Sequence, residues 1–261
     1  YQKQLPQLQY VYSSPNINIS NNLDLVGNPE LESEETIAYE VGYQRILGED
    51  YALDITAFFK DISELINTVN VRDPQIDPTT GDIIGYSGGY TIYENKDYGT
   101  VKGFNVDLAK NYSNYYSGSL SYTYSWATGR SSDPRDGYDA VVSSKTFMPL
   151  KEYPLDWDVR HMFSANFTYR IPQDEGPEIG GIMLDDFGLT VDYSFESGKP
   201  YTAEDINGKE FETNAERLPS QMNTDAKIWK NFEFIGLEYQ IFVKGTNIFN
   251  RRNVVDVFAY T

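Results

Sequence analysis

The residues whose types could do chemistry in this sequence gather in its longest polar segment, residues 129–156. Carboxylates, a guanidinium and a phenol can contact a ligand through ion pairs, hydrogen bonds and ring stacking, and binding residues concentrate in loops. A flexible, solvated loop is the alternative that the same composition allows. Our candidate substrate contacts are Asp133, Arg135, Asp136 and Tyr138, with Asp139 beside them.

Metal binding has weak support in the sequence. His161 is the single histidine of the chain and there is no cysteine, which makes a poor metal site. We therefore expect His161 to have a structural role at the start of a strand. Asp73, Asp77 and Asp82 share one segment and could bind Ca²⁺, but their spacing matches no EF-hand and favours a solvated loop. The sequence thus predicts no metal and no cofactor.

Covalent catalysis and nucleotide binding are also disfavoured. Residues 81–89 hold several glycines but do not follow the spacing of a phosphate-binding loop. One histidine leaves no convincing Ser/His/Asp arrangement. The net charge of −18 opposes nucleic acid as a partner, because no basic stripe exists to neutralise phosphates. We expect neither an enzyme nor a nucleic-acid-binding protein.

The elements that must position these residues are predicted to be strands. From Gly118 to Trp126, apolar or aromatic residues alternate with serine and threonine, and a period of two puts the two sets on opposite faces. A small, uncharged polar face opposite an aromatic face fits a strand between lipid and a wet lumen. No helical periodicity of convincing length occurs. Strands are expected at residues 7–12, 33–46, 51–62 (continuing to 71), 90–112, 117–126, 160–171, 186–196, 222–232 and 237–249.

The predicted connections alternate between short turns and long loops. Short turns are expected at 47–50, 113–115 and 233–236, and long loops at 73–89, 129–156 and 197–218, while 172–185 is of medium length. Short periplasmic turns and long external loops are typical of outer-membrane barrels. No run of about 18 apolar residues is present, so a transmembrane helix is not expected. The fold class predicted is all-β, an antiparallel up-and-down transmembrane β-barrel, with a soluble all-β fold as the alternative.

The alternation also predicts which side chains face lipid. The 22 tyrosines contribute most of the 15% aromatic content, and aromatic rings favour membrane–water interfaces. We expect Glu40, Asp54, Asp107 and Asp192 to face the lumen, with a solvent-exposed face of a soluble sheet as the alternative. The residues expected on the lipid face and its girdles, rather than on a sugar-stacking platform, are Tyr122, Tyr124, Trp126, Phe163, Phe167, Tyr193 and Phe195.

Three motifs resemble those of TonB-dependent outer-membrane receptors. The first motif, at the start of a barrel strand, consists of Gly-Asn-Pro at residues 27–29, Glu34 and Tyr-Glu-x-Gly at residues 39–42. It departs from the family at Ser33, where proline is common. The second, VKGTNIFN at residues 243–250 followed by Arg251, resembles the signature of the penultimate strand. In the third, Asp156-Trp157-Asp158 precedes Arg160-His161, as at the start of a family barrel strand. The signature residues are Asn28, Pro29, Glu34, Tyr39, Glu40, Gly42, Asn247, Phe249 and Asn250.

This resemblance implies a segment of a larger barrel of about 22 strands. Residues 1–261 would be part of one β-barrel domain, with the plug domain and the terminal strand not in this chain. The implied function is energy-coupled uptake of a scarce nutrient (siderophore, cobalamin, glycan or peptide) across the outer membrane of a Gram-negative-type cell. The implied partners are outer-membrane lipid, the plug domain, the TonB energy complex acting through the plug, and a surface lipoprotein. A non-transporting scaffold barrel and a soluble secreted glycan-binding module remain as alternatives.

Overall fold

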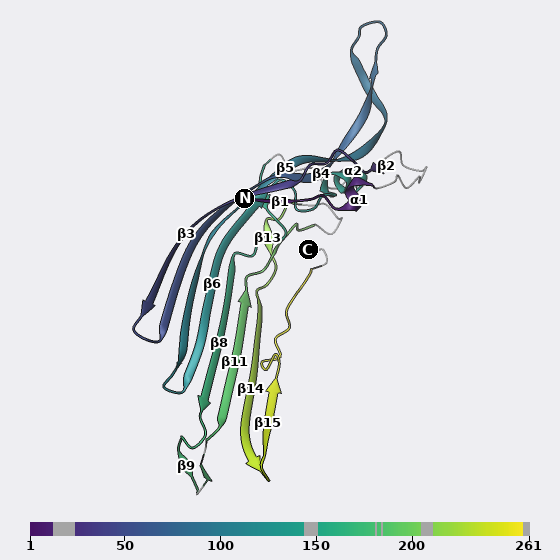
Figure 1. The fold of residues 1–261 in the computed structure, drawn as a ribbon. Coiled ribbons are helices and arrows are strands. Elements are labelled where there is room, and N and C mark those ends of the chain that lie inside the picture. Colours follow the sequence, from purple (N-terminus) through teal and green to yellow (C-terminus); the bar gives the residue numbers. More distant parts are fainter. Residues whose placement is uncertain (13–23, 144–150, 181, 184, 205–210, 258–261) are drawn as a thin grey trace.

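One curved antiparallel sheet dominates the computed structural model, which describes residues 1–12, 24–143, 151–180, 182–183, 185–204 and 211–257 (Figure 1). Its long strands lie in space in the order in which they follow along the chain, each antiparallel to the next. This is the meander predicted from the alternating sequence. The strands are β3 (Glu34–Leu47), β4 (Tyr51–Ile76), β5 (Ile83–Ser113), β6 (Tyr116–Gly129), β8 (His161–Ile171), β11 (Phe187–Glu196), β14 (Gln221–Phe234) and β15 (Leu237–Gly245).

Short helices and strands lie at the long-loop end of the sheet and in the connection between β8 and β11. A helix, α2 (Asp136–Ser143), lies in the segment 129–156, where no helix was expected because so few residues give no readable period. The strand predicted at 7–12 is wrong: this segment holds α1 (Leu8–Val11), closed by a hydrogen bond from Tyr12 N to Leu8 O. The short strands are β1 (Gln2–Gln4), β2 (Asp24–Val26), β7 (Tyr153–Pro154), β9 (Glu178–Ile179), β10 (Ile182–Met183), β12 (Pro200–Tyr201) and β13 (Glu216–Arg217).

The hairpin of β4 and β5 is longer than predicted. The loop expected at 73–89 is mostly paired strand, and the turn is confined to residues 77–82, where Asp77 N donates to Asp82 O at 2.8 Å. Register shifts near Ile62 and Leu65, with Glu64 at φ 57°, mark bulges at which the ribbon bends. Figure 1 shows this hairpin projecting beyond the other strands. Cross-strand pairing overrides the turn-like composition of the segment.

The two faces of the sheet differ in chemistry, as predicted. One row in register joins Gln44, Asp54, Asp107, Ser121, Ser164, Ser194 and Asn223 across seven strands. The adjacent row, on the opposite face, joins Tyr43, Ile55, Val106, Tyr122, Phe163, Phe195 and Met222. We call the first the polar face and the second the aromatic face.

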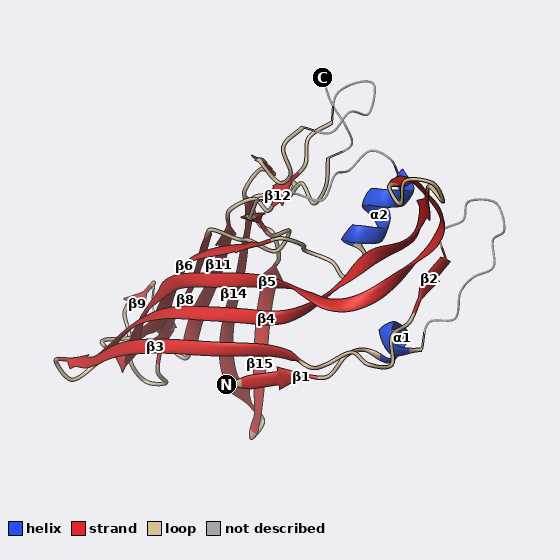
Figure 2. Ribbon diagram, turned by 90° about the horizontal axis from the view of Figure 1, so that it is seen from above, coloured by secondary structure: helices blue, strands red, loops and turns tan. Residues whose placement is uncertain are grey.

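The sheet is an open part of a barrel. Seen from above, it bends along its width, so that β3 to β5 and β14 to β15 run in different directions (Figure 2). Within the described residues, the edge of β3 beyond its short pairing with β1 and the outer edge of β15 have no partner strand. The described residues contain no helix long and apolar enough to cross a membrane.

Candidate ligand site at the long-loop end

The helix α2 is fixed on the β4–β5 hairpin by its backbone. Gly137 N donates to Asn67 Oδ1 at 3.1 Å, and Tyr138 N donates to Thr68 Oγ1 at 2.6 Å. A Cβ at Gly137 would overlap the carbonyl oxygen of Thr68, so only glycine allows this approach. Asn67 in turn donates to Asp97 Oδ2 at 2.5 Å, and both side chains are buried. The described start of this loop is therefore anchored to the sheet, in contrast to the flexible loop that the composition allowed.

The four predicted substrate contacts are close in sequence but have different surroundings. The Asp136 carboxylate accepts hydrogen bonds from Ser132 N at 2.7 Å and Asp133 N at 3.0 Å, and burial raises its pKa above the usual range. Arg135 lies 5.5 Å from the centroid of the Tyr138 ring, a cation–π pair. Of the four, Asp133 lines a cavity. Asp136 closes the turn before α2.

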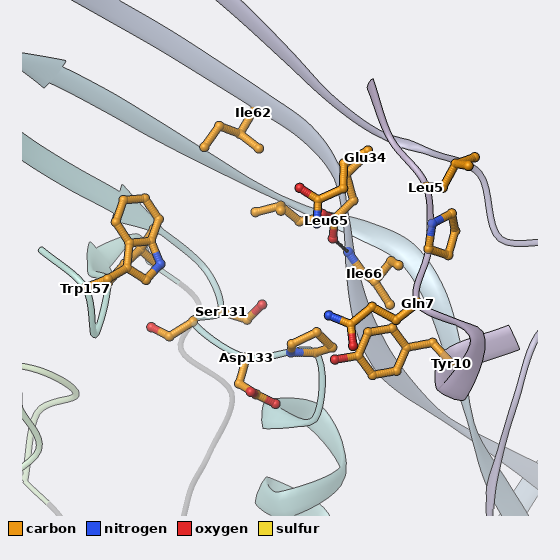
Figure 3. Close-up of a pocket in the computed structure, with 15 residues that line it drawn as sticks. Leu5, Gln7, Tyr10, Glu34, Ile62, Leu65, Ile66, Ser131, Asp133 and Trp157 are labelled. Carbon is orange, nitrogen blue, oxygen red and sulfur yellow. Dashed lines mark hydrogen bonds between the residues drawn. The ribbon is translucent and has the colours of Figure 1, made fainter. Parts of the chain in front are cut away.

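That cavity, of about 330 Å³, lies between the N-terminal segment, β4 and the loop after β6 (Figure 3). Ile62, Leu65 and Ile66 supply an apolar part of its wall. Polar groups come from amides, hydroxyls and two carboxylates, and two aromatic rings complete the lining. The described residues that line it include no lysine or arginine. The side chains that could bind a ligand are Gln4, Gln7, Tyr10, Glu34, Ser131, Ser132, Asp133 and Trp157.

Contacts behind the cavity explain its shape. The Tyr10 ring packs 4.9 Å from the centroid of Tyr93, which is 3% exposed. Glu34 Oε1 accepts a hydrogen bond from Ile66 N at 3.3 Å, beside the bulge in β4. Sequence reasoning missed Tyr10, Gln4, Gln7 and Trp157 as site residues, since no local pattern distinguishes them. Their proximity depends on α1 and the loop after β6 meeting at β4.

A buried ion cluster joins the two long loops beside this cavity. Asp158, 1% exposed, accepts hydrogen bonds from Ala127 N at 2.8 Å and Arg160 Nε at 2.6 Å, and it pairs with Arg217 Nη2. Arg217 also donates to the carbonyl of Asp158 at 3.0 Å. The loop after β11, which carries Arg217, is therefore held against the loop after β6. Asp158 and Arg160 of this cluster belong to the third sequence motif.

The first signature motif has a structural role in the described residues. Asn28 Nδ2 donates to Tyr93 O, Asn28 N donates to Tyr10 O, and Asn28 Oδ1 accepts from Glu30 N, each at 2.9 Å. Pro29 lies in the turn that these bonds close. Asn28 thus holds α1 and the following turn against β5, and Glu34 is the one signature residue that lines the cavity.

The other signature residues lie away from the cavity. Tyr39, Glu40 and Gly42 lie on β3, where Gly42 opposes Thr56 and Tyr39 lies 6.4 Å from the Phe59 ring.

The second motif begins in β15, which ends at Gly245, and its remaining residues form bends and turns, so the predicted end of this strand at residue 249 is wrong. Asn247 and Asn250 have φ of 47° and 50°. Asn247 N donates to Asp225 Oδ1 and Asn247 Oδ1 accepts from Arg251 N, while Phe249 is exposed.

Two of the candidate metal ligands, His161 and Asp77, have other partners. His161 Nδ1 hydrogen-bonds to the Tyr122 hydroxyl at 2.8 Å at the start of β8. Asp77 Oδ1 accepts from Thr79 N at 2.7 Å, and this bond holds the pKa of the Asp77 carboxyl below its usual range. The side chain of Asp73 lies outside the described residues. No group of three or more metal-ligating side chains occurs in the part of the chain that the structure describes.

Comparison with solved structures gives the same architecture at low identity. The outer membrane transporter YddB from Escherichia coli matches with a TM-score of 0.62 and 11% identity over 91% of this chain and 32% of that one. The siderophore receptor PirA from Acinetobacter baumannii matches with a TM-score of 0.56 and 15% identity, over 93% of this chain and 31% of that one. The FrpB iron transporter from Neisseria meningitidis (F3-3 variant) matches with a TM-score of 0.50 and 13% identity, over 88% of this chain and 29% of that one. The chain therefore spans less than a third of the length of these proteins, and the likeness shows the fold.

A family model gives the sequence-level assignment. No curated protein sequence matches the chain significantly. The model described as TonB dependent receptor-like, beta-barrel, matches residues 4–248, which is nearly the whole chain. The chain belongs to the TonB-dependent receptor-like β-barrel family.

Proposed function

We propose that this chain forms part of the wall and external rim of an outer-membrane receptor that takes up a scarce external nutrient with energy from the TonB system. The observation that carries the proposal is the family match over residues 4–248. A sheet with one polar and one aromatic face, and a cavity at its long-loop end, support it. The substrate passes through unchanged, so the proposal involves no enzymatic step and no cofactor.

In this proposal the aromatic face contacts outer-membrane lipid and the polar face lines the lumen. Tyr116 and Trp126 lie near opposite ends of β6. The strand between them rises by about 33 Å at ~3.3 Å per residue. A tilt of ~40° reduces this height to about 25 Å, the height of the apolar band of such barrels. The short turns would then face the periplasm of a Gram-negative-type cell and the long loops the outside.

Residues 1–261 are proposed to be part of one β-barrel domain whose plug domain and terminal strand lie elsewhere in the protein. Side chains such as Asp54, Asp107 and Asp192 would contact the plug or water. The TonB energy complex would act through that plug. A surface lipoprotein is a further candidate partner at the external rim.

The substrate is proposed to contact the cavity beside Asp133. Two of the relatives named above are an iron transporter and a siderophore receptor. The candidates for this chain are a siderophore, a cobalamin, a glycan or a peptide. Because the described lining consists of carboxylates, amides, hydroxyls, rings and apolar side chains, with no lysine or arginine, neutral or cationic ligands fit the cavity better than anionic ones.

Uptake by cells that produce the full-length protein tests this function. We expect TonB-dependent growth on the transported nutrient, with a severalfold slower uptake for Trp157→Ala, which removes a ring from the cavity. Phe211→Ala is the matched control, because Phe211 is exposed in the other long loop and does not line the cavity.

Two outcomes would contradict the proposal. A folded, surface-exposed protein whose cells show no TonB-dependent uptake of any of the four substrate classes would favour the scaffold barrel. A protein that stays monodisperse in water without detergent would favour a soluble module, whose aromatic face packs inside the protein.

A further inference from the structure

Two cations converge on one tryptophan of the aromatic face. Lys102 Nζ lies 5.3 Å from the centroid of the Trp126 ring, and the guanidinium carbon of Arg160 lies 4.2 Å from it. Both distances are within the range of cation–π attraction. The chain as a whole has 39 acidic and 21 basic residues, so two cations against one ring contrast with its overall negative charge.

The register places this group at the long-loop end of the aromatic face. Lys102 pairs directly with Trp126 on β6 and with Phe59 on β4, one row beyond the row that contains Phe104 and Tyr124. Lys102 and Trp126 are exposed. In the orientation proposed above, this row lies at the level of the outer-leaflet headgroups.

The positive charge is incompletely neutralised. Within the described residues, Lys102 forms no ion pair, and Arg160 pairs only with Asp158, whose single carboxylate also serves Arg217. In the next row of the same face, Asp61 lies opposite Thr100, and Thr128 donates a hydrogen bond to Glu152 at 3.3 Å. Neither acid forms an ion pair within the described chain. His161 lies beside the group, with its ring centroid 5.2 Å from that of Tyr124.

A single lysine at this level would need no ligand, because long basic side chains extend towards the interface from apolar surfaces. Two cations against one ring are a different case from a single lysine. Their mutual repulsion makes the arrangement less stable unless an anion lies between or beside them. At the headgroup level that anion is a lipid phosphate, since basic residues near a membrane surface attract anionic headgroups. The tryptophan ring offers an apolar surface for the adjoining part of the lipid.

We propose that Lys102, Trp126 and Arg160 form a binding site for the phosphate-bearing headgroup of an outer-leaflet lipid, with Tyr124 and His161 at its margin. The site rests on the membrane orientation of the proposed function and is independent of transport. Lys102 is the residue to change, because it is exposed, whereas Arg160 belongs to the ion cluster that holds the loops.

The test measures retention of bis-phosphorylated lipid A by the full-length receptor in detergent, by native mass spectrometry. For Lys102→Met we expect binding about fivefold weaker, the effect of one basic residue near a charged lipid surface. Lys60→Met is the matched control: Lys60 Nζ lies 5.6 Å from the centroid of the Phe58 ring, and both residues are on β4, on the polar face. It should bind lipid A as the unchanged receptor does.

Three results would overturn the site. Equal binding by Lys102→Met and the unchanged receptor removes the role of the lysine. Equal binding of lipid A that lacks both phosphates shows that acyl chains alone are held. Displacement of lipid A by millimolar inorganic phosphate shows a site for the free ion.

Heat-dependent mobility in electrophoresis checks that each variant is folded. A receptor that needs no detergent would overturn the membrane orientation itself. A detergent-dependent receptor with lysine-independent lipid binding would overturn the headgroup site alone.

Discussion

Among single residues, Asp158 connects three separate segments at the long-loop end of the sheet. Its carboxylate meets the backbone of β6, the guanidinium that precedes β8 and the guanidinium of Arg217 from the loop after β11. Removing one partner of a buried ion pair is costly, because the remaining charges stay unpaired. The candidate cavity depends on the same loop, since Trp157 and Leu155 both line it.

We therefore expect Asp158→Ala to destabilise the packing of the two loops by about 3–5 kcal/mol. Hydrogen exchange should show faster exchange at the amides of Ala127 and Leu218, which are protected by hydrogen bonds in this region. Glu152→Ala is the control, because Glu152 is exposed and accepts one long hydrogen bond of 3.3 Å from Thr128. Unchanged protection in Asp158→Ala would show that the cluster does not hold the loops.

At the scale of elements, a glycine on β11 makes room for a tryptophan ring on β14. Gly188 and Trp229 are register partners, and a Cβ at position 188 would overlap the indole ring. Lys227 Nζ lies 5.5 Å from the same ring and 4.9 Å from the ring of Phe242 on β15. The indole thus covers the glycine on the polar face and links three strands.

Gly188→Ala should displace the indole and destabilise the barrel by about 1–3 kcal/mol, as an added methyl group does in a closely packed site. The measurement is the tryptophan emission of the full-length protein together with its thermal unfolding. Gly85→Ala is the matched control, since the nearest atom to its added Cβ is 3.5 Å away on the flexible side chain of Gln75. An emission spectrum and melting temperature equal to those of the unchanged protein would show that Trp229 does not depend on Gly188.

For the whole molecule, the decisive feature is the pair of open edges on β3 and β15 within the described residues. Each edge presents unpaired backbone N–H and C=O groups, which neither a bilayer nor a soluble sheet tolerates without a partner. In the solved structures that resemble this chain, the matched part makes up less than a third of the polypeptide.

Residues 1–261 expressed alone should therefore associate through these edges. Light scattering after gel filtration in detergent should show oligomers or aggregates, and electrophoresis should lack the heat-dependent shift of a closed barrel. The full-length protein under the same conditions serves as the control and should be monomeric and heat-modifiable. A monomeric, heat-modifiable product from residues 1–261 would show that this segment closes on itself.

The sequence alone predicted the long strands of the sheet, their two faces and the family, but not the ends of β4, β5 and β15. Alternation of Leu120, Tyr122 and Tyr124 with serine and threonine is a local property. It predicts the two faces correctly because each strand keeps a period of two along its length. Turn chemistry was readable for the same reason, with Gly48 and Gly236 at positive φ in two of the short turns. These features depend on neighbours in sequence.

The candidate site required tertiary structure. Gly137 meets Asn67 across 70 residues, and Arg217 meets Asp158 across 59. No pattern within a segment encodes such distant pairs, so Tyr10, Trp157 and Glu34 could not be assigned to one cavity. The extension of the β4–β5 hairpin to Ile76 and Ile83 was decided in the same way, because backbone hydrogen bonds to the facing strand stabilise a segment whose own composition favours a loop. Local periodicity determined the strands, and contacts between distant segments decided where a ligand could bind.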